Sequence, residues 1–455
     1  MKQIKRIINH FLDDDLYKIT MCLAVLVNFP KAWVIYEFVD RAKLIYPKGF
    51  ADEVNRQIKM LEDVAITEQE IAFMKLRCYF LPEWFYTFLR GFRYNSKYAI
   101  AWQDAEGHLG IKFEGPWWHT ILLEVKVLAI VSELYYIMTQ KDIAFDYDAY
   151  YKKSYQKAYK LLEAGVTFTD FGTRRRSSFQ TQEVAIKAFK DAYESKDWAN
   201  TTGGKFVGTS NVYLAMKYNL IPVGTMAHEF VCGIAGLNGG PTNANKLAME
   251  AWDRAYHGAL GVYLYDSYGF DIFRLNINEA YANQFKGMRV DSGDNFEQLS
   301  NIIQMYKEFN INHKGKQVIF SNALDTDRTI QIHNYAKNVC LPSFGIGTHF
   351  TNDWSGIADG IDPMNIVIKL VAIKECEEWP FYNDTCKLSE DEGKHTGKHE
   401  VVMRFMSQLP QYKNEYDKMR SGRQDSRRPI VRRPPRAAGR SACCILPRGC
   451  PDSGR

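Results

Sequence analysis

The stretch "GVTFTDFGTRRR", residues 165–176, decides the fold class of this 455-residue chain. A short run of β-branched and aromatic residues, typical of a buried strand, ends in a glycine and three arginines. Seven more short strand patterns follow it: "KFVGTSN" (205–211), "LIPVGTMAH" (220–228), "GVYLYDSYG" (261–269), "GMRVDSGD" (287–294), "QVIFSNALD" (317–325), "SFGIGTHF" (343–350) and "MNIVIKL" (364–370). Most of them end in polar or glycine residues and precede helical patterns, so the eight units predict a (β/α) barrel within an α/β fold.

The regions around these units suggest four parts. Residues 1–145 mix helical patterns with short extended runs and predict an N-terminal α+β domain, and residues 146–375 form the barrel. We expect residues 376–412 to be a C-terminal segment that packs back on the first domain. The Arg/Pro-rich tail, residues 413–455, is expected to be disordered or artefactual, even a shifted reading frame.

Composition excludes several classes of protein. With 46% hydrophobic residues the chain can bury a large core, yet no run of about 18 apolar residues is free of charge and proline. The N-terminus reaches three aspartates, residues 13–15, before a secretory apolar core develops. Nine cysteines without CxxC spacing indicate neither a zinc site nor a disulfide framework. These features predict a cytoplasmic protein with no membrane partner.

The net charge of +5 comes from the tail. Residues 420–455 contain ten Arg, no Lys and two Asp, so the first 419 residues carry a net charge of −3. A body with that balance has no bulk attraction to nucleic acid, and we expect no nucleic-acid partner. Contact of the tail with nucleic acid is the alternative that its arginines leave open.

Polar residues stand where the strand patterns end. In a parallel barrel these positions share the carboxyl-terminal face, where active sites assemble. The alternative is that strands end in polar residues simply because loops are solvated. The residues concerned are Arg174, Ser210, His228, Asp266, Asp291, Asn322 and Thr348.

Two of these ends suit anions. Arg174, Arg175 and Arg176 directly follow a strand, and a guanidinium can bind a carboxylate or phosphate through two hydrogen bonds, although a solvated basic loop would read the same. Gly347 and Thr348 lie in "GIGTHFTND", where small residues let backbone N–H groups approach a phosphate.

Two further ends carry groups with several readings. Arg289 and Asp291 are two positions apart on an extended run, so their side chains point to the same side. They could be a cation that binds a polyphosphate beside a carboxylate that binds sugar hydroxyls or a metal. The alternative is an ordinary ion pair. His228 in "VGTMAHEF" reads as a core residue, a metal ligand or a nucleophile. An HExxH zinc motif is excluded because its fifth position is Cys232.

Taken in order, the motifs resemble the nicotinate phosphoribosyltransferase family. The resemblance runs over residues 1 to about 410, through "DDDLYKITM", "DFGTRRRSSFQTQE", "FVGTSN", "GTMAHE", "RVDSGD", "FSNALD", "GIGTHFTND", "MNIVIKL" and "KLSEDEGKHTG". It implies an irregular (β/α) barrel of the type II phosphoribosyltransferase kind. It also implies transfer of a phosphoribosyl group from phosphoribosyl diphosphate to nicotinate, giving nicotinate mononucleotide and diphosphate, coupled to ATP hydrolysis in NAD salvage.

The resemblance also implies roles for individual residues. His228 would be phosphorylated by ATP, with Asp266 orienting it, and Asp291 completes the catalytic set. The nicotinate contacts would be Tyr17, Phe171, Arg174, Ser210 and Thr225. The phosphoribosyl diphosphate contacts would be Asp15, Arg289, Asn322, Gly347 and Thr348.

The implied partners are small molecules and a second copy of the chain. Mg²⁺ would arrive with the diphosphate and with ATP, and no metal is assigned to the protein itself. A homodimer with shared active sites is implied, in which Asp15 and Tyr17 come from the neighbouring subunit.

Three rivals remain for comparison. A nicotinamide phosphoribosyltransferase of the same fold carries an acid where this chain has Ser210, and an acid there would repel a carboxylate. A quinolinate enzyme would need more cations and would lack the histidine cycle. A catalytically inactive binding barrel would more plausibly have lost His228, Asp291 or Arg174, all of which are present.

Overall fold

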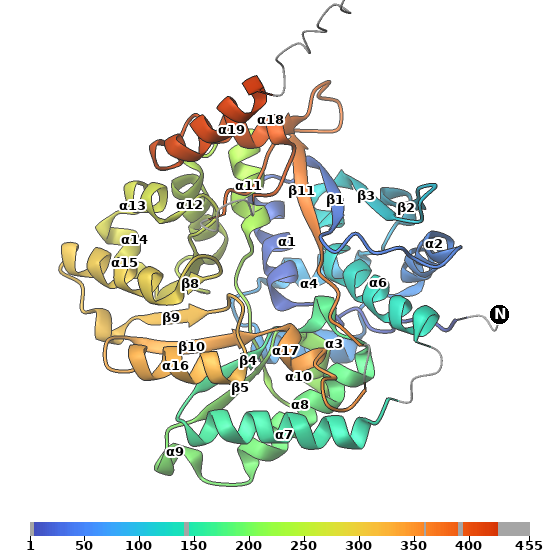
Figure 1. Cartoon of the computed structure of the whole chain (residues 1–455), viewed down its shortest axis with the longest axis vertical. Coiled ribbons are helices and arrows are strands. Elements are labelled where there is room, and N and C mark those ends of the chain that lie inside the picture. The colour runs from blue at the N-terminus through green and yellow to red at the C-terminus, as the bar shows by residue number, and fades with distance from the viewer. Residues whose placement is uncertain (1–3, 141–144, 359–360, 390–394, 426–455) are drawn as a thin grey trace, which may run out of the picture.

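The computed structural model describes residues 4–140, 145–358, 361–389 and 395–425. Two sheets organise this part of the chain: a five-stranded antiparallel sheet and a seven-stranded parallel sheet (Figure 1). One continuous set of buried apolar side chains spans both. None of the helices in these ranges has the length and apolar character that a membrane crossing requires.

The N-terminal domain surrounds the antiparallel sheet, whose strand order is β12-β11-β1-β3-β2. Its strands from this region are β1 (Trp33–Asp40), β2 (Ala99–Gln103) and β3 (Leu109–Pro116). Its helices are α1 (Leu16–Asn28), α2 (Phe50–Met60), α3 (Glu68–Arg77), α4 (Glu83–Gly91), α5 (Trp117–Thr120) and α6 (Glu124–Thr139). Both α1 and α6 are mostly buried, because their sequences are apolar around almost the whole helix.

The second domain is built on the parallel sheet. Its strands are β4 (Thr167–Asp170), β5 (Lys205–Thr209), β6 (Ile221–Pro222), β7 (Val262–Leu264), β8 (Gly287–Val290), β9 (Gln317–Phe320) and β10 (Leu341–Ile346). Its helices are α7 (Tyr147–Glu163), α8 (Phe179–Glu194), α9 (Trp198–Thr201), α10 (Val212–Lys217), α11 (His228–Leu237), α12 (Ala244–Tyr256), α13 (Phe270–Asn276), α14 (Glu279–Gln284), α15 (Asn295–Glu308), α16 (Thr326–Ala336) and α17 (Thr348–Thr351).

The parallel sheet is a curled half-barrel. Its order is β6-β5-β4-β10-β9-β8-β7, so the first and last strands of the chain's strand–helix series meet in the middle of the sheet. The two edges, β6 and β7, pair with β5 and β8 respectively and not with each other. The predicted barrel is therefore confirmed as a parallel α/β architecture but is open on one side.

One strand of the predicted barrel lies elsewhere. β11 (Ile366–Lys374), which includes most of "MNIVIKL", pairs antiparallel with β1 from Trp33↔Lys374 to Asp40↔Ile366 (Figure 1). The prediction of an eighth barrel strand is therefore wrong, because β11 belongs to the antiparallel sheet. The domain boundary predicted at residue 375 is wrong for the same reason. When a strand is apolar and buried on both faces, its sequence does not indicate which sheet it belongs to.

Capping residues end most strand-to-helix turns. The side chains of Ser178, Asn211, Asp294 and Asp325 accept backbone N–H groups at the starts of α8, α10, α15 and α16. By contrast, α11 begins at His228 after Ala227, which offers no side-chain cap. The turn before α11 therefore ends at a histidine, without the side-chain cap that α8, α10, α15 and α16 have.

The C-terminal segment extends further than the sequence predicts. β12 (Asn383–Asp384) pairs with β11, and α18 (His399–Met406) and α19 (Lys413–Asp425) follow. Tyr416 and Met419 of α19 pack on the core, and Glu415 lies 2.8 Å from the ring of His395. A disordered tail from residue 413 is therefore wrong for α19, and the rest of the predicted tail lies outside the described residues.

Candidate active site

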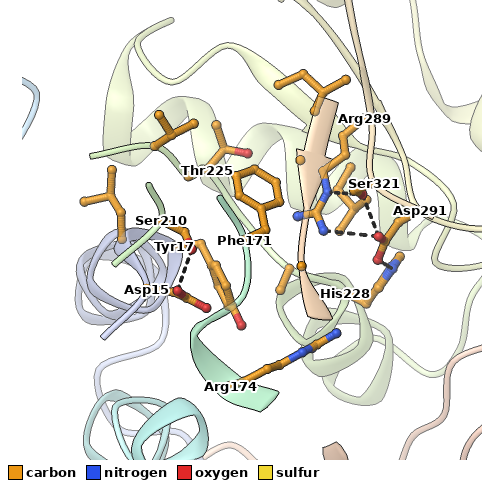
Figure 2. Close-up of a pocket in the computed structure, with 18 of the residues that line it drawn as sticks. Asp15, Tyr17, Phe171, Arg174, Ser210, Thr225, His228, Arg289, Asp291 and Ser321 are labelled. Atoms are coloured by element: carbon orange, nitrogen blue, oxygen red, sulfur yellow. Dashed lines mark hydrogen bonds and ion pairs between the residues drawn. The ribbon is translucent and has the colours of Figure 1, made fainter. Parts of the chain in front are cut away.

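A cavity of about 770 Å³ lies along the inner face of the half-barrel. It runs from the carboxyl ends of the parallel strands to Lys286 and Gln317 at the amino ends of β8 and β9. All the site residues that the family resemblance implies line it except Asp266, and Figure 2 labels ten of the lining residues. The structure therefore brings these strand-end residues together around one cavity, and their individual roles stay predictions.

Two aromatic rings point into the cavity. Tyr17 comes from the first turn of α1 and Phe171 from the end of β4 (Figure 2). Phe171 requires Gly345 on the neighbouring strand, because a Cβ there would lie 2.2 Å from the Phe171 ring. The guanidinium of Arg289 stands over the same ring, 5.5 Å from its centroid.

The three consecutive arginines have three different roles. Arg176 is fully buried and forms a bidentate ion pair with Asp13, with N–O distances of 2.6 and 2.7 Å. Arg175 donates from Nε to the carbonyl of Ile366. Arg174 points into the cavity, and its guanidinium makes no hydrogen bond or ion pair within the described chain (Figure 2). Of the three arginines, Arg174 is therefore the one free to bind an anion in the cavity. Arg175 also lines the cavity, and Arg176 does not.

The segment before α1 is tied to β5. Leu16 donates its backbone N–H to the Ser210 carbonyl, and the Ser210 hydroxyl donates to Asp15 Oδ1 at 2.6 Å. The chain's own Asp15 and Tyr17 therefore line its own cavity, and the prediction that both come from a neighbouring subunit is corrected. Burial raises the pKa of Asp15 above its usual value, against the hydrogen bond from Ser210.

His228 lies where three groups converge on its ring. Its Nδ1 is 3.0 Å from Ser267 Oγ, and its Nε2 is 3.2 Å from Asp291 Oδ2 and 3.0 Å from Lys387 Nζ. Burial and the positive charge of Lys387 lower the pKa of His228 to about 4. The imidazole is therefore neutral at pH 7 and keeps one lone pair.

Asp266 does not bind this ring directly. Its Oδ1 is 4.0 Å from His228 Nε2, beyond hydrogen-bonding distance. Its Oδ2 instead accepts the hydroxyl of Ser292 and, at 3.3 Å, the backbone N–H of Asp291. The prediction that Asp266 orients His228 is corrected: Ser267 and Asp291 contact the ring, and Asp266 supports Asp291 from behind.

Arg289 and Asp291 form the pair that their spacing predicts. Arg289 Nη2 is 3.2 Å from Asp291 Oδ1, and Ser321 Oγ donates to the same oxygen at 2.6 Å (Figure 2). Although burial opposes ionisation, Arg289 and the hydrogen bond from His228 hold the pKa of Asp291 well below its usual range. A fixed carboxylate thus faces both a cation and the histidine.

Two lysines in the cavity escaped the sequence reasoning. Lys387 bonds to His228, and Lys369 lies on β11 beside Arg174. Burial and the charge of Arg174 lower the pKa of Lys369 to about 8. With Arg41 and Arg175 these lysines form a cationic wall suited to phosphates. Lys369 lies within "MNIVIKL" and Lys387 begins "KLSEDEGKHTG". These two motifs were the sequence signal that could have identified the lysines.

The predicted phosphate loop borders the same cavity. Gly347 and Thr348 line it between β10 and α17, and Asn322 lines it after β9, with its Nδ2 donating to the carbonyl of Gly293. A Cβ on Gly347 would approach the carbonyl oxygen of Phe171 to 3.2 Å. A small residue there keeps the loop close to the end of β4.

A buried charge cluster underlies the site. Lys18 donates to both Glu124 and Glu229, and all three side chains are at most 8% exposed. Glu229 directly follows His228, and Lys18 directly follows Tyr17. The cluster therefore links the helix that carries the histidine to the helix that carries the ring.

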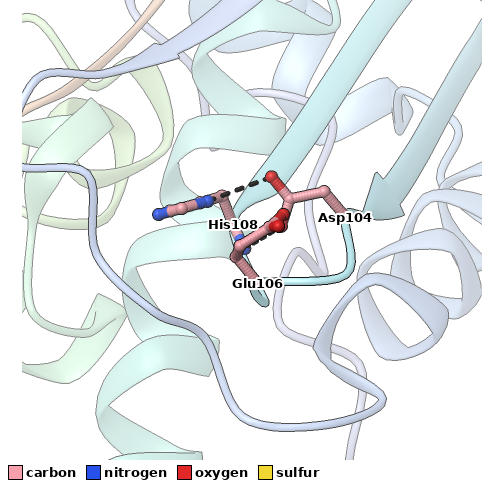
Figure 3. Close-up of side chains that lie close together, drawn as sticks. All are labelled: Asp104, Glu106 and His108. Carbon is pink, nitrogen blue, oxygen red and sulfur yellow. Dashed lines mark hydrogen bonds and ion pairs between the residues drawn. The ribbon is translucent and has the colours of Figure 1, made fainter. Parts of the chain in front are cut away.

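Within the described ranges, three ligating side chains converge in one place, outside the cavity. Asp104, Glu106 and His108 lie on the turn between β2 and β3 (Figure 3). Asp104 accepts the backbone N–H of His108 at 2.8 Å and lies 3.0 Å from its ring, and both side chains are more than 40% exposed. These contacts are those of a tight turn, and we assign no metal to it.

Fold and site together define a class of protein: an α/β half-barrel whose cavity is lined by two aromatic rings and several cationic side chains. The model of the nicotinate phosphoribosyltransferase (NAPRTase) family matches residues 166–405, and that of its N-terminal domain matches residues 12–132. The chain belongs to the nicotinate phosphoribosyltransferase family.

Individual relatives agree with this assignment. The nicotinate phosphoribosyltransferase of Desulforapulum autotrophicum is 36% identical over 87% of this chain and 97% of its own length. A probable nicotinate phosphoribosyltransferase of Schizosaccharomyces pombe is 34% identical over 88% of this chain and 97% of its own. The crystal structure of the Porphyromonas gingivalis nicotinate phosphoribosyltransferase superimposes with a TM-score of 0.82 at 34% identity, covering 89% of this chain and all of that one.

Proposed function

We propose that this protein transfers a phosphoribosyl group from phosphoribosyl diphosphate to nicotinate, giving nicotinate mononucleotide and diphosphate. The reaction is coupled to ATP hydrolysis through a phosphohistidine at His228. In this proposal the enzyme acts in the cytoplasm in the salvage route to NAD.

The observation that carries the proposal is the unpartnered guanidinium of Arg174 beside two aromatic rings. Tyr17 and Phe171 offer faces to a planar pyridine, and Arg174 offers a charge-assisted contact to its carboxylate. Arg174 is half-buried, and a partly desolvated cation without a protein partner is costly unless a ligand supplies the anion. Nicotinate supplies both the ring and the charge.

Transfer itself requires no general base. The pyridine nitrogen attacks C1′ of the ribose with its own lone pair, and the C1′–O bond to diphosphate breaks with its electron pair leaving on the diphosphate. Positive charge develops on the ribose, and the ionised Asp291 stands nearby to stabilise it. The cations Lys369, Lys387 and Arg289 favour the departing diphosphate. Positioning and charge thus supply most of the rate enhancement.

The coupling step uses the neutral imidazole of His228. Its lone pair attacks the γ-phosphorus of ATP, ADP leaves with the electrons of the broken bond, and water later hydrolyses the phosphohistidine to phosphate. Because the pKa of His228 is lowered to about 4, no proton has to be removed before attack at neutral pH. Lys387, whose Nζ lies 3.0 Å from the His228 ring, would pair with a phosphoryl group held on that imidazole.

The residues present fit Mg²⁺ that arrives with its phosphates. Both oxygens of Asp291 are already engaged by protein groups, which leaves no dedicated cage of side chains around it. Mg²⁺ typically keeps several waters and binds through one or two carboxylates plus substrate phosphates, a role open to Asp291 and Asp15. When bound, the ion neutralises diphosphate charge.

A homodimer remains part of the proposal on family resemblance alone. The cavity already contains Asp15 and Tyr17 from its own chain, so these residues do not require a partner. Other residues of a second copy would have to complete a shared site. Sedimentation of the pure protein measures this directly.

The alternative is nicotinamide as the acceptor. Ser210 was expected to leave this part of the site without an acid, but the carboxyl of Asp15 lies next to it. The free cation of Arg174 still favours an anionic acceptor. Nicotinate therefore remains the proposed substrate, and the assay must compare both.

The test is diphosphate release with nicotinate or nicotinamide, with and without ATP. We expect turnover with nicotinate, stimulated by ATP, and acid-labile phosphate on the protein. His228→Ala should abolish phosphoprotein formation and nicotinate-dependent ATP hydrolysis while slow ATP-independent transfer persists, because the substrate sites are intact. Phosphate incorporation into His228→Ala would show that another residue is the nucleophile, and faster turnover of nicotinamide would replace the proposed substrate.

A further inference from the structure

One face of α7 holds the segment that follows the predicted phosphate loop. Tyr150, Lys153 and Lys157 stand at intervals of three and four residues, so they project from the same side of the helix. All three donate hydrogen bonds to backbone carbonyls within residues 349–355. We call these three residues the α7 clamp.

Lys157 makes the contact closest to the loop. Its Nζ donates to the carbonyl of His349 at 2.6 Å and to Asp353 Oδ2 at 2.6 Å. The side chain is 12% exposed and does not line the cavity. Its charge is therefore directed at the backbone one residue after Thr348, and it also acts on the neighbouring ring of His349, which lines the cavity.

The other two members hold the rest of the segment. Tyr150 donates to the carbonyl of Phe350 at 2.9 Å. Lys153 donates to the carbonyls of Asp353 and Ser355, at 3.1 and 2.7 Å, and pairs with the Asp353 carboxylate at 2.9 Å. The clamp thus binds four backbone carbonyls within one short segment, residues 349–355.

The segment needs such support. α17 has four residues, too few to be stable as an isolated helix, and its last carbonyls have no partners within the helix. The clamp supplies those partners through His349 and Phe350. Gly347 and Thr348, the predicted 5′-phosphate loop, directly precede them.

We propose that Lys157 is a positioning residue that sets the affinity for the 5′-phosphate of phosphoribosyl diphosphate by fixing the backbone of the Gly347–Thr348 loop. The inference rests on the proposed function. A displacement of this loop weakens the contacts with the phosphate more than those with the nicotinate ring, because α1 and β4 hold Tyr17 and Phe171.

The test is Lys157→Met, with kinetics in both substrates. We expect KM for phosphoribosyl diphosphate to rise about tenfold, the equivalent of one lost charge-assisted contact. We expect kcat at saturation and KM for nicotinate to change by less than about threefold. Lys157→Arg should restore most of the affinity, because a guanidinium can reach both the carbonyl and the carboxylate.

Lys160→Met is the matched control, since Lys160 lies on the same helix, is 55% exposed and pairs with Asp327. Tyr150→Phe is the second variant if Lys157→Met does not fold; it removes the hydrogen bond to the Phe350 carbonyl and the one accepted from the backbone N–H of Asp353. We expect a KM increase of about two- to threefold for it. An unchanged KM in a folded Lys157→Met or Tyr150→Phe would overturn the proposal.

Calorimetry with ribose 5-phosphate separates this inference from the proposed function. The wild-type protein should bind the probe, and Lys157→Met should bind it about tenfold more weakly. A wild-type protein that binds the probe but makes no nicotinate mononucleotide would refute the function and leave the clamp standing. Equal binding by both proteins would refute the clamp.

Discussion

At the scale of single residues, Ser210 has neighbours that its sequence position did not reveal. The residue is only 2% exposed, and its hydroxyl donates a hydrogen bond to Asp15. Burial raises the pKa of that Asp15 carboxyl. A carboxylate placed at position 210 would stand against an existing carboxyl and beside the acceptor site. The two carboxyl groups would either share one proton or both be ionised. Both arrangements place negative charge beside the acceptor site and so disfavour an anionic substrate.

Ser210→Asp should therefore lower kcat/KM for nicotinate by at least about tenfold, because about 2 kcal/mol of repulsion exceeds the 1.4 kcal/mol that a tenfold change requires. The value for nicotinamide should change little or rise. Steady-state kinetics with saturating phosphoribosyl diphosphate and ATP measure both. Ser210→Asn is the neutral control of equal size. Equal losses on the two substrates would show that position 210 does not face the carboxylate.

At the scale of one element, the turn η3 (Thr173–Arg175) and the residue after it place three identical side chains in different surroundings. Arg174 faces the cavity without a protein partner, whereas Arg176 is buried against Asp13. The tight 3₁₀ geometry turns neighbouring side chains by about a third of a circle each. Two identical residues, two positions apart, can therefore face the cavity in one case and the buried core in the other.

Arg176→Met should destabilise the protein by about 3–5 kcal/mol, since it leaves the buried carboxylate of Asp13 without its cation. Arg174→Met should change stability little but lower kcat/KM for nicotinate about thirtyfold, the equivalent of about 2 kcal/mol. Urea unfolding midpoints and steady-state kinetics on the two variants separate these outcomes. A large stability loss in Arg174→Met would mean that its guanidinium has a structural partner.

At the scale of the whole molecule, the ordered chain continues into α19. Truncation after residue 412 removes the contact of Glu415 with His395 and the packing of Tyr416 and Met419, and should lower Tm by several degrees. Truncation after residue 425 should leave Tm and turnover unchanged. Differential scanning calorimetry on both shortened proteins provides the comparison. A loss of stability from the shorter deletion would contradict the boundary at α19.

Much of this organisation could be predicted from the sequence, and the failures have physical reasons. Strand ends are local signals, so the sequence could group Phe171, Arg174 and Asp291, which line one cavity in the structure. The partners of buried charges are not local, and Lys387 and Asp266 were therefore missed or misassigned. The same holds for β11, whose apolar sequence fits either sheet.

The return of β11 to the first sheet has a consequence for protein synthesis. β1 lies between β3 and β11, and its β11 side stays unpaired until residues 366–374 have left the ribosome. An open strand edge invites pairing with other chains, so the nascent chain carries this hazard through the synthesis of the entire half-barrel. The N-terminal domain is thus the first to be made and among the last to be completed, which ties its folding to that of the domain inserted within it.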